Sequence, residues 1–426
     1  MLLSRFLVNL AKLCYLFGLF SKLYYNQHVN KLLFIKNMFS KYLVYFDEIT
    51  LKGKNKKFFI DKLRKNLKEL MVLPLNIVGR GSKLVLEFSK ELNFEQAREV
   101  EKALSLIPGV AKYAPVAEVR TDLEVIKKKA LEICEFYKPN SFKMIASREY
   151  KKFNFTSPEI SRLVGGYILK KGDWELKVKI KNPELVLGVE VGKEKSFVVG
   201  KRKKGVSGLP VGTAGRAICL LSGGLDSPVA AFQMMKRGVK VTFLHFQNKT
   251  INRQGVELKL RKIVERLGAV QGESELFIVP FEDLQKKVVA EVPADLRMLV
   301  YRRIMLKIAD LFCFKLKAGA IITGDSVSQV ASQTLDNLKV VYKASENIKL
   351  TPLIGFNKSE VIDIARKIKT YEPSILPYED CCSFMIAKHP QTGADLDKVR
   401  LVEKGISLDL LKKAFDNTEQ LTIKSR

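Results

Sequence analysis

The segment LLSGGLDSPVAA, at residues 220–231, constrains the fold of this chain more than any other part of the sequence. It follows the apolar run Ala217–Leu221, which indicates a buried strand, and it leads into residues with helical periodicity. The Ser-Gly-Gly sequence at residues 222–224 allows a tight turn. The helix that we expect from about Ser227 adds unpaired N–H groups and the positive end of its dipole. Such a turn is typical of a pyrophosphate-binding site.

Asp226 is unusual inside an anion-binding turn, because its charge repels phosphate. It fits the site if a Mg²⁺ ion bridges it to phosphate, or if it accepts hydrogen bonds that shape the loop. The segment is not a Walker A loop, because G-x-x-x-x-G-K-[ST] is absent. An ordinary turn is the alternative, but a strand, SGGxDS and a helix in succession form a specific combination.

Apolar runs alternate with helical periodicity from this segment to about residue 369. Four of these runs indicate buried strands: Ala217–Leu221, Val239–Phe246, Glu275–Val279 and Ala320–Thr323. This alternation predicts an α/β domain with a doubly wound parallel sheet. We expect the domain to span residues 206–400, after a basic, glycine-rich linker, and to be followed by a tail at residues 401–426.

Two smaller blocks precede the α/β domain. Residues 38–107 alternate strand and helix, with strands expected at Tyr42–Phe46 and Lys83–Phe88 and helices at Phe58–Leu70 and Phe94–Leu106. That order is typical of a small ferredoxin-like α+β domain. Residues 108–205 form a second α/β block, for which we expect these elements: helices Leu123–Phe136 and Ser157–Lys170, and strands Phe142–Ala146, Leu176–Ile180, Leu185–Val191 and Phe197–Val199.

The charge of the chain favours a polyanionic partner. Lys and Arg number 74 against 45 Asp and Glu, which gives a net charge of +29. Such an excess attracts nucleic acid first and a membrane surface second, although a lysine-rich compositional bias is the alternative. Basic residues mixed with glycines and aromatics suit contacts to phosphates and unpaired bases. The candidate RNA-binding residues are Lys54, Lys56, Lys57, Arg148, Lys151 and Lys152, and solvated loops are the alternative interpretation.

The N-terminal residues and the cysteines indicate in which cellular compartment the protein works. Residues 1–37 contain an apolar run that Asn9 and Lys12 interrupt, too short and polar for a membrane span. A signal or transit peptide is one alternative, and we favour an upstream extension with the true start at Met38. Six scattered cysteines, no C-x-x-C pair and three histidines argue against a disulfide framework or structural zinc. We therefore expect a cytoplasmic protein without a membrane partner.

The segment SGGLDSP closely resembles the PP-loop of ATP pyrophosphatases. Further strings follow the family pattern in order, among them GLPVGTAGR, YRRIM, TGDSVSQVASQTL, TPLIGFNKSEVI and SILPYEDCC. From Met38 to about Asp395 the chain resembles the tRNA 4-thiouridine synthetase family, also called tRNA sulfurtransferases. The resemblance implies a ferredoxin-like domain, a THUMP RNA-binding domain and a PP-loop domain similar to adenine nucleotide alpha hydrolases, in that order.

The resemblance also implies an activity. In that family ATP adenylates O4 of a tRNA uridine, typically uridine 8, and a persulfide sulfur then replaces the oxygen. Asp226 matches the essential acid of the loop, and Lys358 is the expected charge stabiliser, with ATP and Mg²⁺ as cofactors. The matching nucleotide contacts are Leu220, Leu221, Ser222, Gly223, Gly224, Ser227, His245, Phe246, Arg302, Gly324 and Gln333. The leucines and Phe246 could equally be core residues, and His245 a histidine satisfied at a strand end.

The family places a sulfur-carrying cysteine where this chain has Cys381 and Cys382, and Cys382 matches it better. Asp380 disfavours a thiolate there, whereas Lys388 and His389 favour one. The alternative is a pair of small buried residues. The chain ends about 44 residues after Cys382, too soon for the rhodanese domain of some members. We therefore expect a cysteine desulfurase or another persulfide donor as partner. A role in thiamine biosynthesis, through thiazole synthesis, is left open by the sequence.

Two other functions remain open from the sequence. One is an ATP-dependent PP-loop ligase or amidotransferase that acts on a small molecule. The other is an RNA-binding protein without catalysis, whose nucleotide site is vestigial. Family members often form homodimers, so a homodimer is a further expectation.

Overall fold

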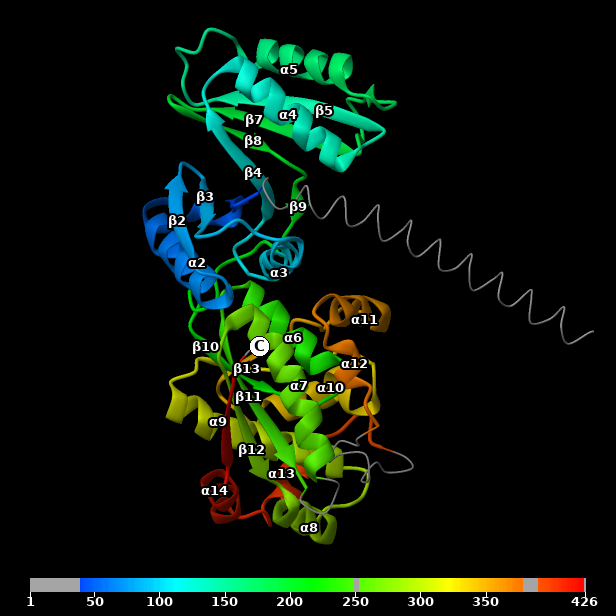
Figure 1. Ribbon diagram of the computed structural model, residues 1–426. Coiled ribbons are helices and arrows are strands. Elements are labelled where there is room, and N and C mark those ends of the chain that lie inside the picture. Colours follow the sequence, from blue (N-terminus) through cyan, green and yellow to red (C-terminus); the bar gives the residue numbers. More distant parts are fainter. Residues whose placement is uncertain (1–38, 249–252, 378–389, 425–426) are drawn as a thin grey trace, which may run out of the picture. The chain divides into compact units, whose positions relative to one another are not determined.

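The computed structural model describes residues 39–248, 253–377 and 390–424 (Figure 1). These residues form two compact units that are discontinuous in sequence. The first unit comprises residues 39–46, 72–105 and 111–205, and the second comprises residues 47–71, 106–110 and 206–424.

The first unit contains a nine-stranded sheet in the order β2-β3-β1-β4-β8-β7-β5-β6, with β9 paired to β4. Its strands are β1 (Lys41–Tyr45), β2 (Leu75–Arg80), β3 (Lys83–Phe88), β4 (Lys112–Arg120), β5 (Ser141–Arg148), β6 (Lys177–Val178), β7 (Leu185–Val191), β8 (Lys195–Val199) and β9 (Lys203–Lys204). Its helices are α3 (Phe94–Leu104), α4 (Leu123–Tyr137) and α5 (Ser157–Lys171). Helices α4 and α5 lie side by side against the sheet (Figure 1).

The two blocks expected at residues 38–107 and 108–205 share one sheet, and strand β4 joins them. Its first half pairs with β1, where Tyr42 faces Pro115, and its second half pairs with β8, where Glu118 faces Phe197. Proline is unusual in a central strand because it cannot donate to the ladder. The Pro115 carbonyl still accepts a hydrogen bond from the N–H of Gly200, 2.9 Å away.

The second unit is built on a six-stranded sheet in the order β14-β13-β10-β11-β12-β15. Its strands are β10 (Arg216–Leu220), β11 (Lys240–Gln247), β12 (Ser274–Pro280), β13 (Ala320–Ile322), β14 (Ile348–Leu350) and β15 (Glu419–Ile423). Its α-helices are α2 (Lys56–Leu70), α6 (Asp226–Lys236), α7 (Arg253–Gln271), α8 (Glu282–Glu291), α9 (Arg297–Leu316), α10 (Leu335–Tyr342), α11 (Lys358–Lys367), α12 (Tyr371–Ser374), α13 (Leu396–Glu403) and α14 (Leu408–Asp416). Two 3₁₀-helices complete it, η1 (Glu48–Asn55) and η2 (Ala331–Gln333).

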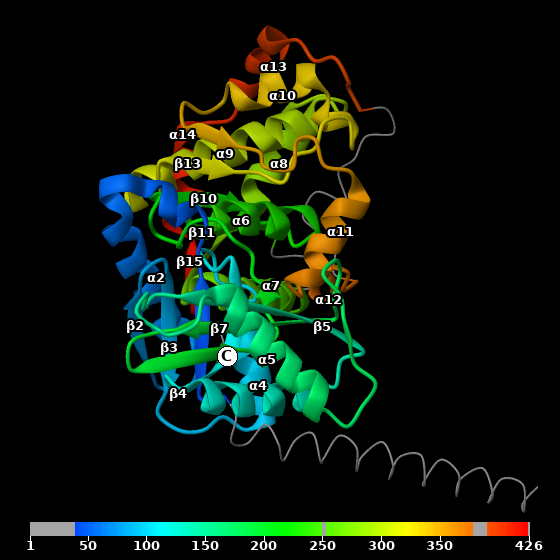
Figure 2. The same ribbon diagram turned by 90° about the horizontal axis from the view of Figure 1, so that it is seen from above.

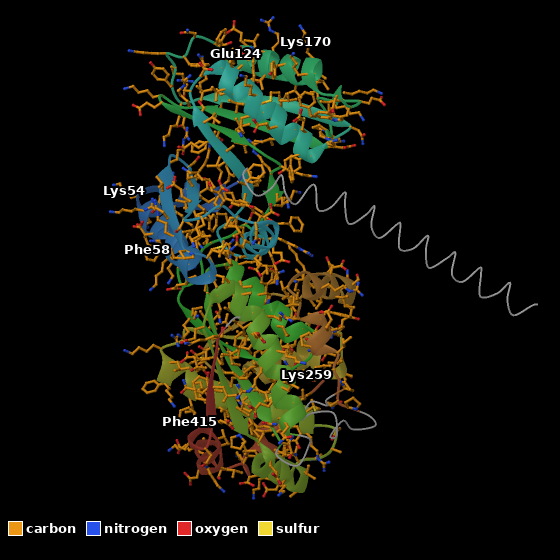
Figure 3. The ribbon with its side chains drawn as sticks, viewed as in Figure 1. Lys54, Phe58, Glu124, Lys170, Lys259 and Phe415 are labelled. Carbon is orange, nitrogen blue, oxygen red and sulfur yellow. The ribbon has the colours of Figure 1, made fainter. Side chains whose placement is uncertain are left out.

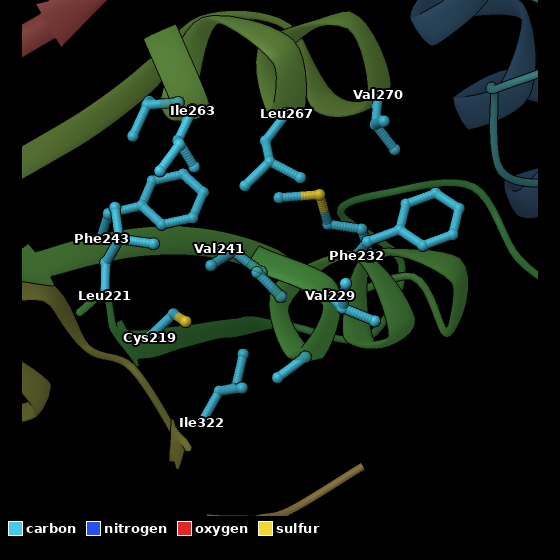
Figure 4. Close-up of a cluster of buried hydrophobic side chains, with 14 of the residues drawn as sticks. Cys219, Leu221, Val229, Phe232, Val241, Phe243, Ile263, Leu267, Val270 and Ile322 are labelled. Carbon is cyan, nitrogen blue, oxygen red and sulfur yellow. The ribbon is translucent and has the colours of Figure 1, made fainter. Parts of the chain in front are cut away.

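Apolar side chains cover both faces of this sheet, as a doubly wound fold requires. Cys219 and Phe243 pack in one cluster with helices α6 and α7, and Figure 4 shows this cluster in close-up. Ile218 and Leu244 pack in the other cluster, with helices α8 and α9. Figure 2 shows α8, α9 and α10 on one side of strands β10 and β11 and α7 and α12 on the other.

Two segments outside the central part of residues 206–400 are also grouped with the second unit. The residues expected as a tail form the end of α13, α14 and β15, and β15 pairs antiparallel with β12. This sheet is therefore parallel except at that edge. Helix α2, expected in the ferredoxin-like block, is grouped with the second unit, where the buried Asn66 side chain donates to the Val211 carbonyl at 3.1 Å.

A buried ion cluster fastens the C-terminal segment to α9. Glu403 accepts from Arg303 at 2.9 Å, and Lys307 lies 3.0 Å from its other oxygen. The Arg303 and Glu403 side chains are only 3% and 6% exposed. We expect Glu403→Gln to lower the free energy of unfolding by about 3–5 kcal/mol, because two cations lose their buried counter-ion. Denaturant titration measures this change.

The matched control for this prediction is Asp283→Asn. Asp283 pairs with Lys413 of the same C-terminal segment at 3.1 Å, but both side chains are well exposed. We expect that change to cost less than about 1 kcal/mol. Equal effects of the two variants would contradict a specific role for the buried cluster.

Candidate nucleotide-binding and catalytic site

The expected strand, turn and helix are present at the proposed phosphate loop. Strand β10 ends at Leu220 and α6 begins at Asp226. The Ser222 N–H donates to Ser227 Oγ at 3.1 Å, and the Gly224 N–H donates to Ser222 Oγ at 3.2 Å. Gly223 has a φ of 90°, which favours glycine. No side chain caps the first N–H groups of α6, so a bound anion can accept from them.

Asp226 meets two side chains that are distant in sequence. Lys358 Nζ lies 2.9 Å and 3.0 Å from its carboxylate oxygens, and Gln329 Nε2 donates to Oδ2 at 3.0 Å. Lys358 is the first residue of α11, where the Asn357 side chain forms a capping box with Glu360. The two residues expected to carry adenylation chemistry are therefore an ion pair.

A cavity of about 210 Å³ opens beside the loop. Its lining residues are Leu220, Ser222, Asp226, Ser227, Arg302, Met305, Leu306, Thr323, Gly324, Asp325, Gln333, Val341 and Tyr342. Seven of these were expected to contact a nucleotide or to act in catalysis. Glycine at position 324 lets the chain after β13 approach the start of α6, because a Cβ there would lie 2.9 Å from the N atom of Ser227.

The sequence interpretation missed Asp325, which organises one wall of this cavity. Both of its carboxylate oxygens lie 2.7 Å from Arg302 Nη2, and Oδ1 also accepts from Gln333 at 3.0 Å. Thr323 and Tyr342 donate to Oδ2 at 2.8 Å and 2.6 Å. The detectable signal was its position in the TGD sequence after β13, since ligand sites gather at the carboxyl ends of parallel strands.

Three of the expected nucleotide contacts lie in the core and do not line this cavity. Leu221, Phe246 and His245 are 1%, 4% and 3% exposed. The His245 Nδ1 atom lies 2.7 Å from the carbonyl oxygen of Leu221, which links the ends of β10 and β11. Burial lowers the pKa of His245 to about 4, and the positive charge of Lys259 acts in the same direction. His245 is therefore neutral at pH 7.

This pKa predicts a loss of stability in acid. The unfolded chain takes up a proton at His245 near pH 6.5, whereas the folded chain does so only near pH 4. The free energy of unfolding should therefore fall as the pH drops from about 6.5 to about 4, by on the order of 3 kcal/mol. His245→Asn keeps a donor for the Leu221 carbonyl and removes the titration. We expect its stability to vary less over this interval, measured by urea unfolding at each pH; an unchanged pH dependence would contradict the prediction.

The described cysteines are poor candidates for carrying sulfur. Burial raises the pKa of Cys134 and of Cys313 to about 12, and it raises the pKa of Cys219 further. A thiolate is the reactive form, so these three residues act as core. Cys381 and Cys382 lie outside the described residues.

The expected RNA-binding residues lie in two separate segments. Lys54 and Lys57 are exposed and Lys56 is half-buried, at η1 and the start of α2; Lys54 is labelled in Figure 3. Lys151 and Lys152 are exposed in the loop after β5. Arg148 donates to the carbonyl oxygens of Lys151 and Phe153, so it supports the loop that presents the two lysines.

Two kinds of feature are absent from the described ranges, a cluster of metal-ligating side chains and a membrane-spanning helix. No group of three or more His, Cys, Asp or Glu side chains there is arranged to hold a metal ion. In the same ranges, no helix has the length and apolar character needed to cross a membrane.

Known families and proteins resemble this chain over most of its length. Three family models match in succession: ThiI ferredoxin-like domain at residues 41–114, THUMP domain at 120–199, and thiamine biosynthesis protein (ThiI) at 212–408. A probable tRNA sulfurtransferase from Acetivibrio thermocellus is 38% identical over 391 residues, which cover 89% of this chain and 98% of the relative. The chain belongs to the tRNA sulfurtransferase family.

Other proteins related to the tRNA sulfurtransferase family are similar to this chain over most of its length. A probable tRNA sulfurtransferase from Bacillus licheniformis is 36% identical, over 90% of this chain and 96% of its own length. The solved structure of a 4-thiouridine synthetase–RNA complex with bound ATP matches with a TM-score of 0.83 and 33% identity, over 91% of this chain and 100% of that chain. These findings confirm the family and the fold class that the sequence predicted.

Proposed function

We propose that the chain is an ATP-dependent tRNA sulfurtransferase that converts a tRNA uridine, uridine 8, to 4-thiouridine. The observation that carries this proposal is the phosphate loop, whose Asp226 pairs with Lys358 and lines a cavity of about 210 Å³. Membership of the family and the ATP and RNA in the related 4-thiouridine synthetase structure support it.

The first step is adenylation of the uridine. The uridine O4 attacks the α-phosphorus of ATP, a P–O bond to that oxygen forms, and the bond to pyrophosphate breaks. The N–H groups of the loop and of the first turn of α6 stabilise the charge that develops on pyrophosphate. Lys358 is placed to stabilise charge at the reacting phosphate.

The residues present fit Mg²⁺ as a cofactor. Lys358 pairs with Asp226 and Arg302 pairs with Asp325, so these four side chains together supply no net positive charge for ATP. Asp226 offers one partly exposed carboxylate, and Mg²⁺ in nucleotide sites is commonly held by one or two carboxylates together with phosphates. Bound Mg²⁺ would compensate the phosphate charge.

The second step is sulfur transfer. We propose that Cys382 carries a persulfide supplied by a cysteine desulfurase or another donor, with Cys381 as the alternative carrier. The terminal sulfur attacks C4 of the adenylated uridine and AMP leaves, which is favourable because adenylation has made O4 a good leaving group. A second thiol then attacks the Cys382 sulfur. A disulfide forms between these two thiols, the bond to the transferred sulfur breaks, and that sulfur stays on C4.

The remaining assignments concern partners and location. The exposed lysines at positions 54, 57, 151 and 152 contact tRNA phosphates in this proposal, in keeping with the net charge of +29. The protein is a cytoplasmic homodimer in the same proposal. The three described cysteines, Cys134, Cys219 and Cys313, are buried free thiols and support the cytoplasmic location, since reducing compartments keep thiols free.

A pyrophosphate-release assay with and without tRNA tests the proposal. We expect release that depends on tRNA, together with 4-thiouridine when a persulfide donor is added. A transcript with cytidine at position 8 is the matched control and should not be thiolated. Release without RNA would favour a small-molecule ligase, and no release under any condition would favour an RNA-binding protein without catalysis.

A further inference from the structure

Asp226 has a second partner that differs from Lys358 in kind. Gln329 Nε2 donates to Asp226 Oδ2 at 3.0 Å, whereas Lys358 Nζ contacts both carboxylate oxygens. A lysine that turns toward a phosphate leaves the carboxylate. A neutral amide is attracted to a phosphate charge much less than an ammonium is, so it can hold the carboxylate throughout the reaction.

Gln329 is presented by a closed loop at residues 326–333. The Ser328 N–H donates to the Gln333 carbonyl at 3.0 Å, and Ser328 has a φ of 62°, so the loop returns on itself. The Val327 N–H donates to the Ile354 carbonyl at 3.1 Å, and the Ser326 hydroxyl donates to the Phe356 carbonyl at 3.0 Å. Residues 354–356 lead directly into Lys358. One connected piece of backbone therefore brings both partners to Asp226.

Asp325 anchors the two ends of this loop. It precedes Ser326, and its carboxylate accepts from the Gln333 side chain at 3.0 Å. Arg302, which lies 2.7 Å from that carboxylate, also donates to the Ser332 carbonyl at 2.8 Å. Asp325 is 4% exposed, so these contacts are protected from water. The buried carboxylate therefore fixes the base of the loop, with Gln329 between the two anchored ends.

We propose that Gln329 is a positioning residue for the Asp226 carboxylate and that Asp325 positions Gln329 by anchoring the loop. This inference rests on the proposed function, because it assigns to both residues a role in adenylation. Neither residue needs to touch the substrate.

The first experiment measures tRNA-dependent pyrophosphate release by Gln329→Met and Gln329→Glu. We expect Gln329→Met to lower kcat about tenfold with less than about a twofold change in KM for ATP, because one hydrogen bond to a charged group is lost. Gln329→Glu should lower kcat by at least about a hundredfold, because it places a second carboxylate beside Asp226.

Val330→Ala is the matched control for these variants. Val330 is on the same loop, 51% exposed, and does not line the cavity. We expect its kcat and KM to equal those of the wild type. A Gln329→Met variant with wild-type kcat would overturn the inference. Absence of pyrophosphate release by the wild type would instead overturn the proposed function.

The second experiment tests the anchoring role of Asp325 by hydrogen exchange. We expect Asp325→Asn to raise the exchange rate of the Ser328 amide at least about tenfold and to lower kcat, because Arg302 loses its counter-ion and the base of the loop loosens. Asp310→Asn is the matched control. Asp310 is a half-buried carboxylate on α9 that accepts hydrogen bonds from Ser345 and Asn347, but it is outside the cavity. Unchanged exchange at Ser328 in folded Asp325→Asn would overturn the anchoring role.

Discussion

Asp226→Ala should lower the rate of tRNA-dependent pyrophosphate release by at least about a hundredfold, the range seen when one electrostatic contact to a transition state is removed. The substitution removes the carboxylate proposed for Mg²⁺ and leaves Lys358 and Gln329 without their shared partner. We expect little loss of ATP affinity, because a repulsive charge disappears and Lys358 becomes free to meet phosphate. Single-turnover release and direct ATP titration separate the two effects.

Asp363→Asn is the matched control for this prediction. Asp363 is an exposed carboxylate on α11, the helix that begins at Lys358, and it does not line the cavity. We expect wild-type kinetics from that variant. Asp226→Ala with more than about a tenth of wild-type pyrophosphate release would contradict the proposed charge arrangement.

Cys382→Ser should stop thiolation while adenylation continues. A serine hydroxyl cannot carry a persulfide, whereas pyrophosphate release depends on the loop and on Asp226, which the substitution leaves in place. We expect no detectable 4-thiouridine by nucleoside mass spectrometry and a pyrophosphate burst close to that of the wild type. Adenylation and sulfur transfer would thereby be separated in one variant.

Cys313→Ser provides the comparison for this prediction. Cys313 is 3% exposed in the core and its thiol has a raised pKa, so it should not carry sulfur. We expect that variant to keep both steps, apart from a modest loss of stability. Full thiolation by Cys382→Ser with Cys381 intact would show that Cys381 is the carrier.

The phosphate loop could be predicted from sequence because its determinants are local. The apolar strand, the small residues of the turn and the first turn of α6 are consecutive, so spacing alone specifies them. The spacing could not predict that Leu220 lines the cavity whereas Leu221 packs in the core. Both faces of a doubly wound sheet are apolar, so neighbouring leucines at the end of a strand carry no signal of direction.

Long-range pairing accounts for the other differences between expectation and structure. Strand β15 alternates between polar and apolar residues, but only its partner β12, about 140 residues earlier, makes it part of the sheet. Strand β4 was not among the expected strands, and it contains Pro115, a residue that is unusual in a central strand. Asp325 is one acid among many in sequence, and it becomes a hub only when α9 and α10 bring Arg302 and Tyr342 to it.

The discontinuous second unit has a consequence for how the protein is made and cut. Its sheet is completed by β15 at residues 419–423, while its helix α2 comes from residues 56–70. During synthesis the nucleotide-binding half therefore cannot reach its final form until nearly the whole chain has left the ribosome. A fragment that starts at residue 206 lacks α2, and one that stops before residue 419 exposes the edge of β12. Each fragment therefore lacks part of the second unit that the intact protein contains.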